Sequence, residues 1–368
     1  MNKNLLILSS STGGGHNMRA NALKHWWQSI GGNAIVSQPL ETTSSLYKFG
    51  SNFYNFIQRF YPALHLFYFH FLEIASFHRN KRTIIGADPW LKEIKDFNPK
   101  LVLSVHAHLN HGYLDLLRDE LGDFFKFAIY CGELADGNGF SRHWVNPMAD
   151  YFLGPFDETC KAAKIRNMPV NKTLTVGPLL RKAFYRQSSE DFKNTVFNKY
   201  QISPDIPIFL LGTGANGVNR HIDVLNSLKN HHEKFQVIAL CGSNLKIFTK
   251  IQEMKKNLKF NILPLKTIED KEMALFLREA KFLFARPGAG TTTEALICGT
   301  PMIFDVSRGI MPQEFNNLNF WKLYSSEILC LKEPKNIYKF LGKPIPKIKI
   351  NASSSPKVLL DHLELICS

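Results

Sequence analysis

The sequence has little of what marks a disulfide-rich, zinc-binding or membrane-spanning protein. Its six cysteines are scattered over 368 residues, form no Cys-x-x-Cys pair and have no histidine at zinc-finger spacing. This argues against a structural zinc site or a disulfide framework and favours a reducing compartment. We find no run of about 18 uncharged apolar residues, so no segment is expected to span a bilayer. The apolar run at residues 5–8 is too short for a secretory signal.

Acidic residues are also scarce, with 31 Asp and Glu against 45 Lys and Arg, which leaves a formal net charge of +14. Such an excess implies an anionic partner: nucleic acid, a phosphorylated metabolite or an acidic membrane surface. Nucleic acid is the least favoured of the three, because the chain lacks an aromatic RNA-binding motif, a zinc finger and an arginine-rich helix. The hydrophobic share of 45% is ordinary for a globular protein and excludes extended disorder.

Short apolar runs alternate with helical patterns, which is the signature of parallel, doubly wound sheets. The predicted strands are residues 5–8, 34–37, 101–105, 127–131, 151–153, 173–176, 208–211, 236–240, 260–263, 282–284, 302–304 and 328–331. A polar stretch from Arg181 to Pro207 separates the first six from the rest. We therefore predict an α/β protein with two Rossmann-like domains, residues 1–182 and 183–345, facing a cleft, and a C-terminal tail or helix at 346–368.

One segment breaks the alternation, because residues 47–77 hold 12 aromatic side chains. Phe53, Phe56 and Phe60 lie at helical spacing on one face, and basic residues such as Arg59 flank them. A basic, aromatic helical pair is typical of an interfacial membrane helix, so we predict a membrane-docking segment at 47–82. The alternative is a buried helical hairpin, since aromatic stripes also fill protein cores.

The first predicted strand runs into a glycine-rich loop, Ser9 to His16, followed by a helix expected to begin near Asn17. Three glycines let the backbone approach a ligand, and the N–H groups of a helix start favour an anion. The loop lacks the Gly-Lys-Ser/Thr ending of a nucleotide-triphosphate loop and the spacing of the dinucleotide fingerprint. His16 is a candidate general base, and the alternative is a histidine that caps the helix.

Two more small-residue loops follow strands of the second domain. Residues 286–295 place Arg286, Gly288 and Gly290 before Glu294, a carboxylate suited to holding the vicinal hydroxyls of a ribose. Residues 211–217 contain Gly212 and Gly214 in the same context. Either loop alone is compatible with glycines that serve packing only. Together the three loops predict a phosphorylated ligand.

A His-x-His pair, His106 and His108, ends another predicted strand, as in some metallohydrolases. Glu133, Asp136 and His143 are the residues that would complete such a metal site. No further ligand pattern recurs on later strands, so this remains a minor alternative.

Several short motifs occur in order over about residues 5–320. They are Thr12-Gly13-Gly14-Gly15-His16 with Ala20, Ala22 and Leu23; Ser104-Val105-His106; Val176-Gly177-Pro178; Arg286-Pro287-Gly288 with Thr291, Glu294 and Ala295; Gly299-Thr300-Pro301; and Gln313-Glu314 with Asn317. Taken together, these motifs resemble glycosyltransferase family 28, and within it the monogalactosyldiacylglycerol synthases and processive diacylglycerol glucosyltransferases.

The resemblance implies a GT-B fold in which the N-terminal domain holds the acceptor and the C-terminal domain a UDP-sugar, with inversion and no essential metal or other cofactor. It makes His16 the general base, assigns the ribose to Glu294, and places His106, Glu133 and His143 on the acceptor side. The donor-binding residues it implies are Gly14, Gly15, Gly212, Gly214, Arg286, Gly288, Ala289, Gly290, Thr291, Glu294, Gln313, Glu314 and Asn317.

One departure concerns the acceptor side, where the lipid synthases usually carry Thr-Asp-Leu and this chain has Gly132-Glu133-Leu134. The expected activity is inverting transfer of galactose or glucose from a UDP-sugar to diacylglycerol, by a peripheral enzyme on the cytoplasmic face of an anionic membrane, with no nucleic-acid partner. The alternatives are N-acetylglucosamine transfer to an undecaprenyl-linked muramyl peptide, a GT-B epimerase or phosphorylase, and a non-catalytic nucleotide- or lipid-binding protein of this fold.

Overall fold

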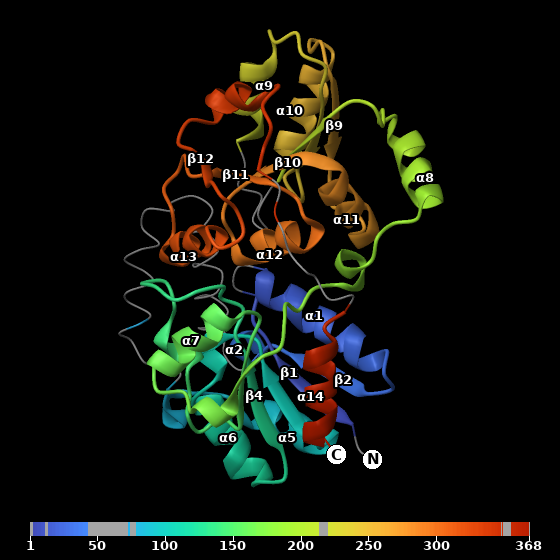
Figure 1. Cartoon of the computed structure of the whole chain (residues 1–368). Coiled ribbons are helices and arrows are strands. Elements are labelled where there is room, and N and C mark those ends of the chain that lie inside the picture. Colours follow the sequence, from blue (N-terminus) through green and yellow to red (C-terminus); the bar gives the residue numbers. More distant parts are fainter. Residues whose placement is uncertain are drawn as a thin grey trace. The chain divides into compact units, whose positions relative to one another are not determined.

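The computed structural model describes residues 3–11, 14–42, 73, 79–212, 220–346, 348 and 355–367. The chain divides into two compact units, drawn in Figure 1. Unit 1 comprises Met1–Lys182, Met311–Asn316 and Ser353–Ser368, and unit 2 comprises Ala183–Ile310 and Asn317–Ala352. The predicted membrane residues Phe53, Phe56, Arg59 and Phe60, and the loop glycine Gly214, lie outside the described residues.

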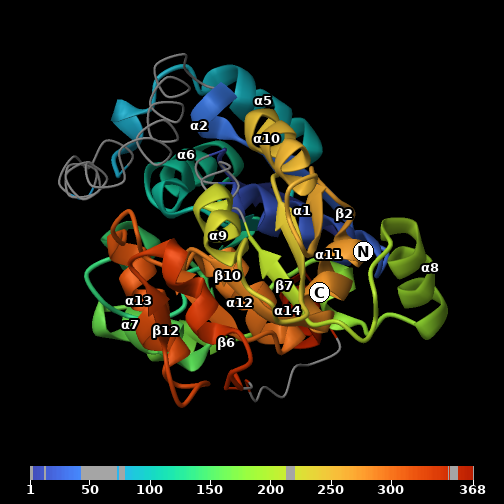
Figure 2. The ribbon, with the colours of Figure 1, turned by 90° about the horizontal axis from the view of Figure 1, so that it is seen from above.

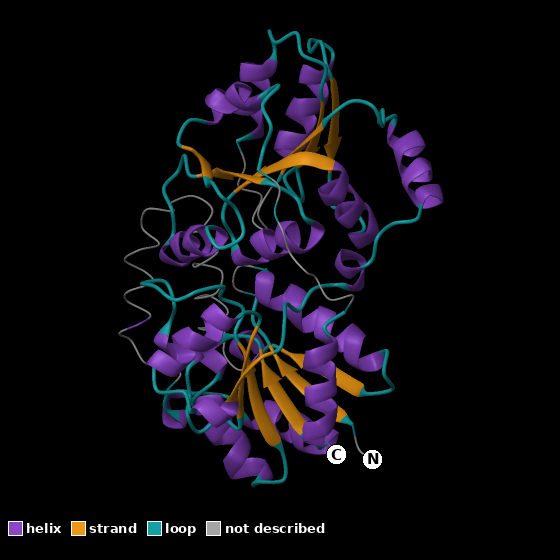
Figure 3. Cartoon of the chain, in the orientation of Figure 1, coloured by secondary structure: helices purple, strands orange, loops and turns teal. Residues whose placement is uncertain are grey.

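Unit 1 contains a six-stranded parallel sheet, with helices packed around it (Figure 3). Its strands are β1 (Asn4–Leu8), β2 (Asn33–Ser37), β3 (Leu101–Ser104), β4 (Lys126–Tyr130), β5 (Tyr151–Gly154) and β6 (Thr173–Thr175), in the order β2-β1-β3-β4-β5-β6. Its helices are α1 (Gly15–Gln28), α2 (Pro39–Thr42), α5 (Asp88–Phe97), α6 (Gly112–Leu121), α7 (Asp157–Ile165) and α14 (Lys357–Cys367). Because the chain moves from β1 to β2 and then to β3 on the other side, β1 and β3 form the topological switch point.

Unit 2 repeats this plan with a second six-stranded parallel sheet, in the order β12-β11-β10-β7-β8-β9. Its strands are β7 (Ile208–Leu211), β8 (Gln236–Leu240), β9 (Asn261–Leu265), β10 (Ala280–Ala285), β11 (Met302–Asp305) and β12 (Leu329–Leu331). Its helices are α8 (Glu190–Tyr200), α9 (His221–Leu228), α10 (Leu245–Lys255), α11 (Asp270–Glu279) and α12 (Ala289–Cys298), and α13 (Pro312–Trp321) is shared with unit 1. Here the switch point lies between β7 and β10.

All twelve predicted strands are confirmed, since each predicted run overlaps one observed strand. For the inner strands, the reason is burial on both faces. Leu5, Leu6, Ile7 and Leu8 of β1 are all fully buried. A parallel strand covered by helices on both sides must be apolar throughout, so it appears in the sequence as an uninterrupted apolar run.

Helix boundaries follow local capping signals. The hydroxyl of Ser189 accepts from Phe192 N at 3.3 Å at the start of α8, and Asn244 Oδ1 accepts from Ile247 N at 3.1 Å at the start of α10. At the other end, α12 stops at Gly299, whose φ of 71° lies in the left-handed region that favours glycine.

The C-terminal helix α14 returns to unit 1. Lys3 Nζ pairs with Glu364 Oε1 at 2.5 Å, and the Tyr151 ring contacts His362 edge-on at 5.0 Å. Both views of the ribbon show α1 running along β2 (Figure 2). No described helix combines the length and the apolar character needed to cross a bilayer. All six cysteines carry free thiols.

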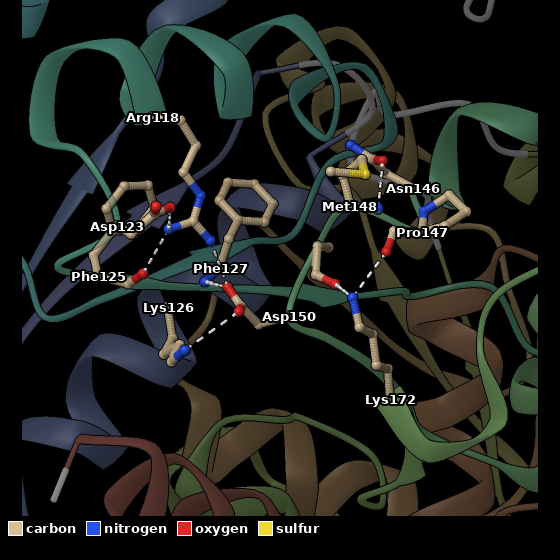
Figure 4. A network of polar contacts seen from close by, with 11 residues as sticks. Arg118, Asp123, Phe125, Lys126, Phe127, Asn146, Pro147, Met148, Asp150 and Lys172 are labelled. Atoms are coloured by element: carbon tan, nitrogen blue, oxygen red, sulfur yellow. Dashed lines mark hydrogen bonds and ion pairs between the residues drawn. The ribbon is translucent and has the colours of Figure 1, made fainter.

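A polar network joins the amino ends of β4, β5 and β6 in unit 1 (Figure 4). The guanidinium of Arg118, on α6, donates to Phe125 O at 3.0 Å and to Asp150 Oδ2 at 2.8 Å. Asp150 Oδ2 also accepts from Phe127 N at 2.8 Å, and Lys172 Nζ donates to Ala149 O at 3.0 Å. These bonds lie at the end of the sheet opposite the carboxyl ends of the strands, which leaves the carboxyl ends for ligands.

Candidate functional site

The glycine-rich loop of unit 1 lies at the switch point of its sheet. Gly14 caps α1 with a φ of 71°, a left-handed conformation that favours glycine. The helix begins at Gly15, two residues before the predicted start, so His16 stands inside its first turn. The backbone N–H groups of that turn have no acceptor within the helix. The fold therefore places a histidine and free N–H donors together at the carboxyl end of β1.

The imidazole of His16 is held in one tautomer. Its Nδ1 lies 2.7 Å from Val105 O, at the end of β3. A carbonyl oxygen only accepts hydrogen bonds, so Nδ1 carries the proton and Nε2 keeps its lone pair. Burial and the nearby Arg19 guanidinium lower the pKa of His16 to about 4, although the bond to Val105 opposes this change. His16 is therefore neutral at pH 7, with Nε2 able to accept a proton.

Further histidines follow His16 along the ends of β3 and β4. The His106 ring meets His16 edge-on at 4.5 Å, and His106 Nδ1 accepts from His108 N at 3.3 Å. His108 lies 4.8 Å from His143, which lies 6.2 Å from His111, all measured between ring centroids. The structure thus brings the predicted residues His106 and His143 into the neighbourhood of His16.

His111 is a member of this row that the sequence analysis did not single out. Burial, followed by the charge of Arg79, lowers its pKa to about 3, so it is neutral. Within the described ranges, no three histidine, cysteine or acidic side chains are arranged to hold one metal ion. The arrangement therefore gives no support to the metallohydrolase alternative built on His106 and His108.

Glu133, at the end of β4, belongs to the same site. Burial raises its pKa, whereas the Arg19 guanidinium and a hydrogen bond with the Trp144 side chain act in the opposite direction. The Trp144 ring lies 6.1 Å from that of His16. Arg19 Nη2 donates to Gly132 O at 2.9 Å. No sequence motif pointed to Arg19, because its neighbours in the folded chain, Gly132 and Glu133, are far from it in sequence.

A polar network supports the loop between β1 and α1. Asn17 Oδ1 accepts from Ser9 Oγ at 2.7 Å and from Gln38 Nε2 at 3.0 Å. Glu41 Oε1, on α2, accepts from Ser10 Oγ and from Ser11 N, both at 2.7 Å. The described parts of the loop are therefore fixed by side chains from two helices, which limits how far its backbone can shift.

In unit 2, the carboxyl ends of the neighbouring strands β7 and β10 also lie at a switch point. A Cβ placed on Gly288, the cap of α12, would meet nothing within 4 Å, so the backbone here is open to a ligand. A Cβ on Gly212 would stand 3.0 Å from Ala285 Cβ and 3.0 Å from Leu283 Cδ1, so this glycine allows β7 and β10 to pack closely. The first turn of α12, Ala289 to Thr291, presents free N–H groups, and Glu294 is buried one turn further on.

Helix α13 carries the remaining predicted donor residues. Asn317 Nδ2 donates to Pro287 O at 2.7 Å, which ties α13 to the loop after β10. Glu314 Oε2 accepts from Met311 N at 2.9 Å and is 2% exposed. Gln313 and Glu314 belong to the segment of α13 assigned to unit 1, and Asn317 belongs to unit 2. The predicted donor set is therefore distributed over both units.

The comparisons with known proteins agree with this architecture. Residues 208–332 match the model of the glycosyltransferase family 28 C-terminal domain. A probable monogalactosyldiacylglycerol synthase 3 from rice is 24% identical over 330 residues, covering 82% of this chain and 61% of the relative. The processive diacylglycerol beta-glucosyltransferase of Bacillus licheniformis is 24% identical over 333 residues, covering 87% of this chain and 81% of the relative. The chain thus spans less than two thirds of the length of the rice relative.

Solved structures show the fold. MurG from Acinetobacter baumannii superposes with a TM-score of 0.54 at 14% identity, covering 98% of this chain and 95% of that one. Arabidopsis thaliana UGT89C1, complexed with UDP-L-rhamnose, superposes with a TM-score of 0.59 at 11% identity, covering 99% and 94%. Two parallel six-stranded sheets and these matches establish the GT-B fold. Residues 208–332 therefore match the C-terminal domain of glycosyltransferase family 28, and most of the chain is similar to members of the diacylglycerol glycosyltransferases.

Proposed function

We propose that this enzyme transfers a hexose from a UDP-sugar to the free hydroxyl of diacylglycerol, with inversion, at the surface of an anionic membrane. The observation that carries the proposal is His16, a neutral imidazole whose Nε2 is free to accept a proton at the switch point of unit 1. The distant relationship to diacylglycerol glycosyltransferases supports the choice of acceptor.

Unit 1 would bind the acceptor, with His106, Glu133 and His143 around its hydroxyl. In the reaction, Nε2 of His16 takes the proton of that hydroxyl while its oxygen attacks the anomeric carbon of the sugar. The bond between that carbon and the diphosphate oxygen breaks, and UDP leaves with the bonding electrons. Because His16 is already neutral at pH 7, it needs no prior deprotonation.

Unit 2 would bind most of the donor. We assign the ribose hydroxyls to Glu294 and the diphosphate to the N–H groups at the start of α12, where Gly288 leaves the backbone open. A helix N-terminus stabilises negative charge, so it would stabilise the departing UDP without a metal ion. The other donor contacts that we propose are Gly14, Gly15, Gly212, Gly214, Arg286, Ala289, Gly290, Thr291 and Asn317, with Gln313 and Glu314 on the sugar hydroxyls.

The proposal is tested by supplying the purified enzyme with UDP-galactose, UDP-glucose or UDP-N-acetylglucosamine. Each donor is combined with liposomes that contain either diacylglycerol or an undecaprenyl-linked muramyl peptide, and the products are identified by mass spectrometry. We expect one hexose on diacylglycerol from at least one of the first two donors, and none with His16→Ala. Transfer only to the muramyl peptide, or sugar release without a lipid product, would contradict the assignment of the acceptor.

A further inference from the structure

Arg19 stands one turn of α1 beyond His16. Residues three apart on a helix are neighbours on its surface. The Arg19 guanidinium reaches across to the end of β4, where Nη2 donates to Gly132 O at 2.9 Å. It also passes over Gly15, where an added Cβ would lie 3.8 Å from Arg19 Nη1. One cation is therefore held between the glycine-rich loop and the loop that carries Glu133.

The space for this guanidinium exists because residue 132 is glycine. A Cβ at Gly132 would come within 2.2 Å of Arg19 Cζ and 2.3 Å of Nη1. No side chain tolerates such a contact, so any other residue at this position would push the guanidinium away. The position of the positive charge therefore depends on both residues, and it can be changed by substituting either Arg19 or Gly132.

Several titratable groups lie on the elements that carry His16 and its neighbours. They are Arg19 on α1 itself, His106 and His108 in the loop after β3, and Cys131 and Glu133 in the loop after β4. The cationic charge of Arg19 acts on both His16 and Glu133, and in each case it favours the deprotonated form. Trp144 adds a hydrogen bond to Glu133.

We propose that Arg19 is a positioning residue whose guanidinium, held by Gly132 O one helical turn from His16, keeps the imidazole from taking up a proton before the acceptor arrives. This inference rests on the proposed role of His16 as the base. Without the guanidinium, no neighbouring positive charge would oppose the imidazolium, so a larger fraction of His16 would be protonated before the acceptor arrives.

The test compares Arg19→Gln, Arg19→Lys, Gly132→Ala and the control Lys24→Gln, which removes a positive charge from the same helix away from the site. The His16 resonances of each folded variant are titrated by NMR in the absence of substrate, and kcat/KM is then measured against pH. We expect Arg19→Gln and Gly132→Ala to raise the pH midpoint of the His16 NMR titration by about one unit or more. The acid limb of kcat/KM should shift to higher pH by the same amount. Arg19→Lys should retain most of the wild-type behaviour, and Lys24→Gln all of it.

The proposal is overturned if His16 titrates at the wild-type midpoint in both Arg19→Gln and Gly132→Ala, or if Lys24→Gln moves the midpoint as far as Arg19→Gln does. A loss of kcat at all pH values without a shift of the midpoint indicates a structural role and also contradicts it. The NMR titration needs no turnover, so it distinguishes a failure of this proposal from an enzyme that lacks the proposed transferase activity.

Discussion

The low pKa of His16 predicts how the rate responds to acid. If the neutral imidazole is the base, kcat/KM follows its neutral fraction. With a pKa of about 4, about 90% of His16 is neutral at pH 5, whereas an ordinary value of 6.5 would leave about 3% neutral. Between pH 7.5 and pH 5, we therefore expect kcat/KM to fall by about 1.1-fold rather than about 30-fold.

The assay measures initial rates of transfer to a short-chain diacylglycerol in neutral detergent micelles, so that no lipid headgroup titrates over this range. Enzyme held at pH 5 and then assayed at pH 7.5 controls for irreversible inactivation. His16→Ala should lose at least about 100-fold in kcat while still binding UDP, which is typical for the removal of a general base. An acid limb centred near pH 6.5 in the wild type, or near-normal turnover of His16→Ala, would refute the reasoning.

Three other predictions concern the ribose site, the aromatic segment and the buried histidines. Glu294→Ala should weaken UDP binding by about tenfold or more, because a charged hydrogen-bond acceptor is lost, and unchanged affinity by calorimetry would remove Glu294 from the ribose site. Replacing Phe53, Phe56 and Phe60 with Ser in a folded protein should reduce its flotation with anionic liposomes, and undiminished flotation would return this stripe to the core. Stability to urea should decline as the pH falls from about 6.5 to about 4, because three buried or partly buried histidines have lowered pKa values and the unfolded chain binds protons that the folded chain does not. They are His16, His111 and His221, and equal stability at pH 7 and pH 5 would contradict this reading.

The strands and the glycine loops were predictable from the sequence because each depends on neighbouring residues. A strand buried on both faces is apolar throughout, as β1 and β7 are. Small residues after such a strand mark a turn that leads into a helix, as at Gly14 and Gly288. The start of α1 was predicted two residues late, because Gly14 is itself the cap and a glycine offers no side chain by which a cap is recognised.

The groups that set the chemistry of His16 were not predictable in this way. The Val105 carbonyl, the Arg19 guanidinium and the Gly132 backbone come from three elements far apart in the chain. Nothing in the sequence pairs an arginine on the first helix with a glycine more than 100 residues later, since that contact depends on the order β1-β3-β4 in the sheet.

The sequence by itself determined the two α/β units, the positions of the twelve strands and the resemblance to family 28, because apolar periodicity and short motifs are local properties. Tertiary structure alone decided which loops share a switch point, which nitrogen of His16 carries the proton and why its pKa falls. Hydrogen bonding and desolvation depend on groups that only the folded sheet brings together, so they could not be predicted from the order of the residues.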